Sequence, residues 1–344
     1  IEAVFTKPPD IGTPYHIINY EDSRQTIGVT KGEINNTCKL FRNTSTSQIP
    51  IKWKKLIESI KEIEKKINSD ILDIEFGITT KKSIIIFQVR PITSISNNPP
   101  SKLEQNILKL IIKEKRKFRK INKKNTNFGN YTIFSDMSDW NPAEIIGDRP
   151  KLLDYSLYDY LIMKKIWNQS RKIIGYQNVE PYCLMVKFGN KPYVDLRGSF
   201  NSLIPKTFNK IQKTKLINFY LKKLDTNRHL HDKIEFEILF SCFDLGINSR
   251  LKELRKYNFT NEEIQDIKNT LTVFTNEIIS SFPKIQKNCE KSIYQLSKNR
   301  KQILANLNSK SNYRDFLLSA EELLKNCRKF GTLPFSTMAR ISFI

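Results

Sequence analysis

Two stretches of the sequence carry residue types that suit a nucleotide and a metal ion. Asp73–Phe76 precedes a short polar turn, and Phe87–Pro91 closes the apolar run that follows. If the two runs pair as an antiparallel hairpin, Glu75 and Gln88 come from adjacent strands. Gln88 and Arg90 then share a face, because side chains alternate along a strand. Carboxylate and amide oxygens suit Mg²⁺, and a guanidinium suits phosphate oxygens. The competing interpretation is an outward face with only a cross-strand Glu75–Arg90 ion pair.

A second polar pattern lies at Tyr193–Asn201. Polar residues stand at every second position of this run, so on a strand they would share one face, which Ser199 also joins. Such a face could line the pocket of a small-molecule acceptor, and its candidate residues are Asp195, Arg197 and Asn201. It could equally be a solvated strand with a local ion pair.

Two further polar groups are explained more simply by local structure. One cluster consists of Asp136, Asp139, Asn141 and Glu144. The run Asn141–Glu144 suits a helix start, with Asn as the N-cap and Pro at the first position, although a ligand-binding role is an alternative. His229 and His231 would suit zinc on a strand, but the acids that follow lie in a predicted helix, which disfavours a metal site.

A sheet in the N-terminal part of the chain must position the first group. Tyr15–Tyr20 and Thr26–Thr30 are short β-prone runs, and Ile71–Phe76 alternates polar and apolar residues. Ser83–Val89 is a nearly continuous apolar run, which suits a buried central strand. Between these runs, apolar residues recur at steps of three and four and predict an amphipathic helix. They are Trp53, Leu56, Ile60, Ile63 and Ile67.

The rest of the chain is predicted to be mainly helical. Ser94–Ser101 has the prolines and asparagines of a linker, and helical patterns dominate from Leu103 and again after Pro205. Thr260 and Glu263 form a capping box before a long apolar stripe. The expected fold class is therefore α+β, with an antiparallel sheet domain followed by a mainly α-helical domain that has a few strands.

The charge of the chain is strongly positive, with 58 Lys and Arg against 35 Asp and Glu and a net charge of +23. Such a balance suits polyanions. However, Lys, Ile and Asn are abundant throughout, as an AT-rich coding sequence gives without any binding role. For the dense basic run Lys113–Lys124, whose one aromatic residue is Phe118, we favour a solvated connector helix over a nucleic-acid-binding patch.

The cysteines and the hydropathy of the chain point to a reduced, cytoplasmic protein. The five cysteines are widely spread and form no CxxC pair, so neither a zinc site nor a disulfide framework is indicated. No apolar run reaches the roughly 18 residues that a membrane helix needs, so we expect no membrane partner.

The sequence Asp73–Phe76, a turn, and an apolar strand that ends in Gln88–Thr93 closely resembles the end of the ATP-binding domain of pyruvate phosphate dikinases and phosphoenolpyruvate synthases. The resemblance implies an ATP-grasp fold in which Glu75 and Gln88 bind the metal and Arg90 contacts phosphate. It covers residues 1–96, as the C-terminal part of that domain. The family's upstream half has no counterpart in this sequence.

Residues 131–344 resemble the central, largely helical region of phosphoenolpyruvate-synthase-like proteins. The resemblance is carried by Phe134–Pro150, Lys191–Pro205, His231–Gly246 and Gly331–Arg340. Rifampin phosphotransferase shares this order, with an acceptor-binding domain after the ATP domain. Residues 97–130 would be the linker and the basic connector helix. We expect the sequence to be a fragment, because it starts with Ile and stops within an apolar run.

The resemblance implies phosphoryl transfer from ATP, with Mg²⁺, to pyruvate or another small-molecule acceptor. The family transfers phosphate through a phosphohistidine domain, whose Gly-rich motif contains none of the three histidines here. The resemblance identifies no catalytic residue in this chain. Two alternatives stay open: a non-catalytic nucleic-acid- or polyanion-binding protein, and a degenerate relative that keeps the fold as a scaffold without turnover.

Overall fold

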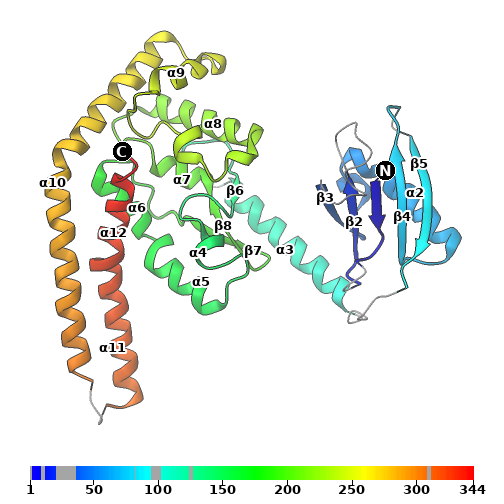
Figure 1. Cartoon of the computed structure of the whole chain (residues 1–344), viewed down its shortest axis with the longest axis horizontal. Helices are drawn as coiled ribbons and strands as arrows, with labels where there is room; N and C mark the ends of the chain where they lie inside the picture. Colours follow the sequence, from blue (N-terminus) through cyan, green and yellow to red (C-terminus); the bar gives the residue numbers. More distant parts are fainter. Residues whose placement is uncertain are drawn as a thin grey trace. The chain divides into compact units, whose positions relative to one another are not determined.

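The chain divides into two units, Ile1–Lys115 and Arg116–Ile344. The computed structural model describes residues 2–8, 12–20, 36–81, 83–93, 102–123, 127–307 and 311–344. The boundary between the units falls within helix α3 (Leu103–Lys123), inside the predicted connector (Figure 1).

The first unit is built on a five-stranded antiparallel sheet in the order β3-β2-β1-β4-β5 (Figure 1). Its strands are β1 (Glu2–Phe5), β2 (Tyr15–Tyr20), β3 (Asn36–Phe41), β4 (Leu72–Ile78) and β5 (Ile84–Pro91), with the short helix η1 (Thr46–Gln48) after β3. Helix α2 (Ile51–Ile67) packs against one face of the sheet, because its apolar stripe is buried with the inward residues of the strands.

The expected elements of this unit are largely confirmed. Helix α2 forms with Trp53, Leu56 and Ile60 buried, although Ile67 at its end is 46% exposed. The strand at Tyr15–Tyr20 and the hairpin of β4 and β5 are also confirmed. Thr26–Thr30 and the linker at Ser94–Ser101 lie outside the described residues.

The prediction of a buried central strand at Ser83–Val89 is wrong. Strand β5 lies at the edge of the sheet as described, and none of its residues is buried. Ile85 and Phe87 are 46% and 55% exposed. The apolar run misled because only its alternate residues, such as Ile84 and Ile86, pack against the core under α2.

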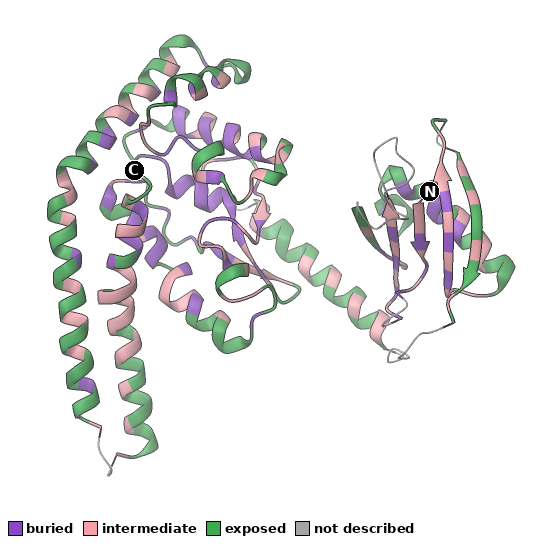
Figure 2. Ribbon diagram, viewed as in Figure 1, coloured by how far each residue is buried: buried purple, intermediate pink, exposed green. Residues whose placement is uncertain are grey.

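The second unit surrounds a small antiparallel sheet with helices (Figure 2). In the described residues, the sheet has the order β6-β8-β7, formed by β6 (Phe134–Ser135), β7 (Met185–Phe188) and β8 (Lys191–Asp195). The α-helices are α4 (Pro142–Ile145), α5 (Leu152–Tyr158), α6 (Ile166–Ile174), α7 (Leu196–Ser202), α8 (Lys210–Thr226), α9 (Ile247–Leu251), α10 (Asn261–Ala305), α11 (Tyr313–Asn326) and α12 (Leu333–Ile341). The shorter helical segments are η2 (Asp159–Met163), η3 (Arg228–Leu230), η4 (Ile234–Ile238), η5 (Lys252–Tyr257) and η6 (Cys327–Thr332).

The core of the second unit lies between the small sheet and helices α7 and α8. It includes Val194, Phe200, Leu216 and Tyr220, which are at most 1% exposed. The predicted helix starts at Asn141 and Thr260 are confirmed, since each side chain accepts a backbone N–H of its helix.

The prediction of one strand through Tyr193–Asn201 is wrong. Strand β8 ends at Asp195 and helix α7 begins at the next residue. The alternation was misleading because Asp195 is an N-cap: its side chain accepts the backbone N–H of Gly198, 3.4 Å away, and turns the chain into a helix.

All five cysteines are free, as their spacing predicted. In the described parts of the chain, no helix is both long and apolar enough to cross a lipid bilayer.

Candidate functional site

The three residues predicted to bind nucleotide meet on the β4–β5 hairpin. Glu75 pairs with Gln88 across the two strands. Nη2 of Arg90 lies 2.6 Å from Oε1 of Glu75 and 3.4 Å from Oδ2 of Asp73. The predicted antiparallel hairpin is therefore confirmed, and an acid, an amide and a guanidinium share one face of the sheet. The cross-strand Glu75–Arg90 ion pair of the competing interpretation is present as well.

A β-bulge gives these side chains a common direction. Leu72, Ile74 and Phe76 face the core, so Asp73 and Glu75 face outward. On β5, Ile86 pairs with Phe76 and Gln88 pairs with Glu75, which leaves Phe87 as an additional residue. Strict alternation from the inward Ile86 would turn Gln88 inward as well. The bulge resets the alternation, so that Val89 packs on the core and Gln88 and Arg90 face outward.

Asp73 is a site residue that the sequence analysis did not assign. Its carboxylate completes an acidic pair beside Arg90, and burial raises its pKa while the Arg90 charge opposes that shift. The signal was present in the sequence, because Asp73 and Glu75 are two positions apart and must share a face on any strand.

The donor set of this face fits a magnesium ion that binds together with phosphates. Two carboxylates and one amide are too few for a dedicated protein cage. Mg²⁺ commonly keeps several waters and takes one or two carboxylates plus the phosphates of its substrate. Neither this face nor any other part of the described chain has a group of three or more His, Cys, Asp or Glu side chains that could hold a metal.

The predicted acceptor residues are engaged by the protein itself. Asp195 is fully buried and accepts hydrogen bonds from Oγ1 of Thr132, at 2.5 Å, and from the hydroxyl of Tyr182. Burial raises the pKa of Asp195, and these two hydrogen bonds oppose the shift.

Arg197 and Asn201 hold backbone rather than ligand. Arg197 is fully buried and donates to the carbonyls of Ile121 and Asn122, at 2.8 and 3.0 Å. The amide of Asn201 accepts from the backbone N–H of Phe128 at 3.0 Å and donates to its carbonyl at 2.8 Å. These contacts give Asp195, Arg197 and Asn201 a structural role and correct their assignment to a solvent-facing strand.

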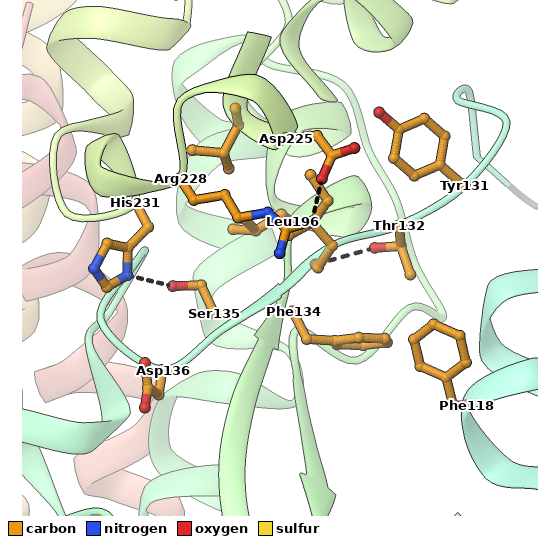
Figure 3. A pocket seen from close by; sticks show the side chains of 12 residues that line it. Phe118, Tyr131, Thr132, Phe134, Ser135, Asp136, Leu196, Asp225, Arg228 and His231 are labelled. Carbon is orange, nitrogen blue, oxygen red and sulfur yellow. Dashed lines mark hydrogen bonds and ion pairs between the residues drawn. The ribbon is translucent and has the colours of Figure 1, made fainter. Parts of the chain in front are cut away.

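The second unit also contains a pocket of about 550 Å³ (Figure 3). Its lining residues are Phe118, Tyr131, Thr132, Ile133, Phe134, Ser135, Asp136, Leu196, Leu224, Asp225, Arg228 and His231. Two of them, Thr132 and Leu196, link the pocket wall to the buried Asp195 network.

The two ends of the pocket differ in chemistry. His231 and Ser135 lie at one end, where Nδ1 of His231 is 3.0 Å from Oγ of Ser135 (Figure 3). Phe118 lies at the other end, and its ring packs edge-on against Phe134 with centroids 5.6 Å apart. Arg228, whose Nη2 is 2.9 Å from Oδ1 of Asp225, lies between them. The pocket therefore offers an aromatic wall and a polar end.

The remaining sequence candidates are separated by the fold. His229 lies in the short helix η3 and His231 follows it, so the strand that a His-x-His zinc site needs is absent there. Asp136 lines the pocket of Figure 3, whereas Asp139 is buried 2.6 Å from Nη2 of Arg171. Oδ1 of Asn141 accepts the N–H of Glu144 at 3.2 Å, as the helix-start interpretation required.

No protein-family model, curated protein or solved structure matches this chain. The family resemblance of its motifs therefore stays a prediction.

Proposed function

We propose that the outward face of the β4–β5 hairpin binds Mg·ATP and that the chain belongs to a dikinase-like phosphotransferase. The observation that carries the proposal is the gathering of two acids, an amide and a guanidinium on one outward face, with Gln88 opposite Glu75. The ion pair of Arg90 with Glu75, at 2.6 Å, is common to this proposal and to the competing interpretation. The family resemblance supports the same assignment for Glu75, Gln88 and Arg90.

The charges of the face suit an exchange of partners on nucleotide binding. Without nucleotide, Arg90 is balanced by Glu75 and Asp73. With Mg·ATP, Glu75 and Gln88 would hold the metal, and Arg90 would turn its fork of N–H donors to phosphate oxygens. The metal would supply charge neutralisation, on which phosphoryl transfer chiefly depends. The family resemblance implies that the phosphate would then pass through a phosphohistidine domain.

We propose the pocket of Figure 3 as the acceptor site, in place of Asp195, Arg197 and Asn201. Its volume of about 550 Å³ lies within the range of ligand pockets, roughly 300–1,000 Å³. That is far more than the three carbons of pyruvate occupy. The aromatic wall of Phe118 and Phe134 favours a larger acceptor with an apolar body, whose polar end meets Ser135 and His231.

The test is binding of a fluorescent ATP analogue to the full chain, titrated with and without Mg²⁺. We expect saturable, Mg²⁺-dependent binding that Arg90→Met weakens about tenfold or more, since a charge-assisted hydrogen bond contributes roughly 1.5–3 kcal/mol. Glu75→Gln should weaken the dependence on Mg²⁺ more than the affinity without it.

A matched control uses an ion pair on helix α2. Lys66 and Glu62 are paired at 2.8 Å and highly exposed, like many surface pairs. Lys66→Met should leave nucleotide binding unchanged. Equal binding by Arg90→Met and Lys66→Met, or no Mg²⁺-dependent binding at millimolar analogue, would contradict the proposal.

The polyanion-binding alternative rests on α3, which has no buried residue. Its aromatic residue Phe118 packs against Phe134 and Phe188, which also contact each other. Nζ of Lys117 donates to the Lys187 carbonyl. Filter binding of DNA over a salt series separates the two functions. DNA binding that weakens steeply as the salt concentration rises, and that ATP does not displace, would favour the alternative.

A further inference from the structure

Helices α6 and α12 of the second unit pack side by side (Figure 1). Residues of both helices line a second, smaller cavity. Its lining residues are Asp139, Trp140, Arg171, Glu235, Ser336, Ala339, Arg340 and Phe343, and we call it the Arg340 cavity. Its volume is about 170 Å³. At about 30 Å³ per molecule, that is the space of five or six waters, so any ligand has only a few heavy atoms.

One arginine of the cavity is fully compensated. Arg171 donates through Nη2 to Oδ1 of Asp139 at 2.6 Å and through Nη1 to Oγ of Ser202 at 2.6 Å. Oγ of Ser199 donates to the other oxygen of Asp139 at 2.5 Å. Both charged side chains are at most 5% exposed. Burial raises the pKa of Asp139, but the charge and hydrogen bond of Arg171, the hydrogen bond from Ser199 and the charge of Arg340 lower it overall, so this carboxylate balances Arg171.

The other arginine has no acid in ion-pair contact, although the charges of Asp139 and Glu235 lie near it. Arg340 is 6% exposed, and Nη2 donates to Oγ of Ser241 at 2.7 Å and to the hydroxyl of Tyr176 at 3.2 Å. Both partners are neutral. Among the described residues, no carboxylate oxygen lies within the 4.0 Å of an ion pair with Arg340. Its Nε is buried without any hydrogen-bond partner. Buried guanidinium groups are normally paired, because desolvation of an isolated charge is costly.

The remaining acid of the cavity, Glu235, makes no ion pair with Arg340 in the described structure. Burial and the nearby Asp139 charge raise the pKa of Glu235, and the charges of Arg340 and Arg171 oppose that shift. The cavity is therefore lined by a buried guanidinium that has neutral hydrogen-bond partners and no ion-pair partner among the described residues.

We propose that the Arg340 cavity is a binding site for the carboxylate group of a small organic acid. A buried guanidinium without an ion-pair partner suits an anion, and its planar fork of donors matches the geometry of a carboxylate. Trp140 and the 48% exposed Phe343 contribute aromatic surface for a short carbon chain. The site does not depend on nucleotide binding, since it lies wholly within the second unit.

The experiment is isothermal titration of the full chain at pH 7 with formate, acetate and pyruvate, and separately with inorganic phosphate. We expect one carboxylate per chain and a midpoint of thermal unfolding that rises with carboxylate concentration. Arg340→Met should weaken carboxylate binding at least tenfold. Arg250→Met, which removes an arginine of the same unit from outside the cavity, should not change it.

A second variant keeps the Arg340 charge and fills the cavity. Ala339 lies on α12 and lines the cavity, so Ala339→Leu places a larger side chain there without altering Arg340. It should abolish carboxylate binding in a chain that still folds, so the test does not depend on the behaviour of Arg340→Met.

Three results would overturn the proposal: no saturable binding of any of the carboxylates up to tens of millimolar, unchanged binding in Ala339→Leu, or tighter binding of phosphate than of every carboxylate.

Discussion

The guanidinium of Arg197 donates to the backbone carbonyl of Asn122 at 3.0 Å, at the end of helix α3. A second nitrogen donates to the carbonyl of Ile121 at 2.8 Å, and the side chain is fully buried. The last carbonyls of a helix have no hydrogen-bond donor within the helix. Arg197, at the start of α7, donates to two of them. This relationship ties α3 to the core of the second unit.

Arg197→Met should therefore loosen the end of α3 and destabilise the second unit. The substitution leaves two helix carbonyls without their donors, and we expect a loss of about 2–4 kcal/mol in the free energy of unfolding. Hydrogen exchange of peptides covering 116–123 should become faster. Arg197→Lys should recover part of the protection. Arg255→Met, at an exposed position, is the control. Equal exchange in Arg197→Met and Arg255→Met would show that the carbonyl contacts are not important.

The parts of the fold that could be predicted are helices whose apolar residues repeat regularly or whose first turn carries a capping box. The stripe of Trp53, Leu56 and Ile60 identified α2 because a helix with one buried face repeats every three or four residues. Thr260 and Glu263 identified the start of α10 because their reciprocal hydrogen bonds are local in sequence.

The residues that could not be predicted depend on distant partners. Asp195 closes a strand, as its neighbours predict, but its contacts with Thr132 and Tyr182 arise from tertiary packing. Its N-cap contact with Gly198 is local, and the alternation of polar residues obscured it. The Arg340 cavity likewise joins segments more than a hundred residues apart. Within the nucleotide face, the hairpin itself was predictable, whereas the bulge at Phe87, which brings Gln88 opposite Glu75, was not.

Gly198 is the next residue whose substitution should be costly. A Cβ at this position would overlap the Tyr182 ring, which the hydroxyl contact with Asp195 holds in place. Gly198→Ala should therefore destabilise the second unit by about 1–3 kcal/mol, the usual cost of overpacking. Thermal unfolding measures the difference.

Gly246→Ala is the matched control for Gly198→Ala. Its added Cβ would meet only the end of the Asp244 side chain, at 3.2 Å, and that side chain can move. The two substitutions should differ clearly in unfolding midpoint. If the Gly198→Ala chain is as stable as the Gly246→Ala chain, the Tyr182 ring can move aside to accommodate the added Cβ, and the prediction is wrong.

Substitutions in the capping box of α10 should have a smaller and more local effect. Oγ1 of Thr260 accepts the N–H of Glu263 at 3.1 Å, and Oε2 of Glu263 accepts the N–H of Thr260 at 2.8 Å. Thr260→Ala should cost about 1 kcal/mol and accelerate amide exchange in the first turn. Thr260→Ser should retain the cap. Thr272→Ala, in the middle of the same helix, should be neutral or slightly stabilising. A Thr260→Ala chain with unchanged exchange at 261–264 would contradict the prediction.

His16 should make the first unit sensitive to mild acid. Its side chain is 1% exposed, and its Nδ1 is buried without a partner. Burial, followed by the charges of Arg42 and Lys61, lowers its pKa to about 3. In the unfolded chain the pKa of histidine is about 6.5. The unfolded state therefore binds a proton first as the pH falls, and the first unit loses stability from pH 6.5 towards pH 3.

At pH 4.5 the predicted loss from His16 is about 2–3 kcal/mol, since each pH unit between the two pKa values contributes about 1.4 kcal/mol. Urea unfolding at several pH values, read by hydrogen exchange of peptides within 12–20, measures it. His16→Leu should flatten the profile between pH 6.5 and 4.5, whereas His229→Gln, in the second unit, should not. If His16→Leu loses stability over that interval as the unsubstituted chain does, the acid sensitivity belongs to the carboxyl groups instead of to His16.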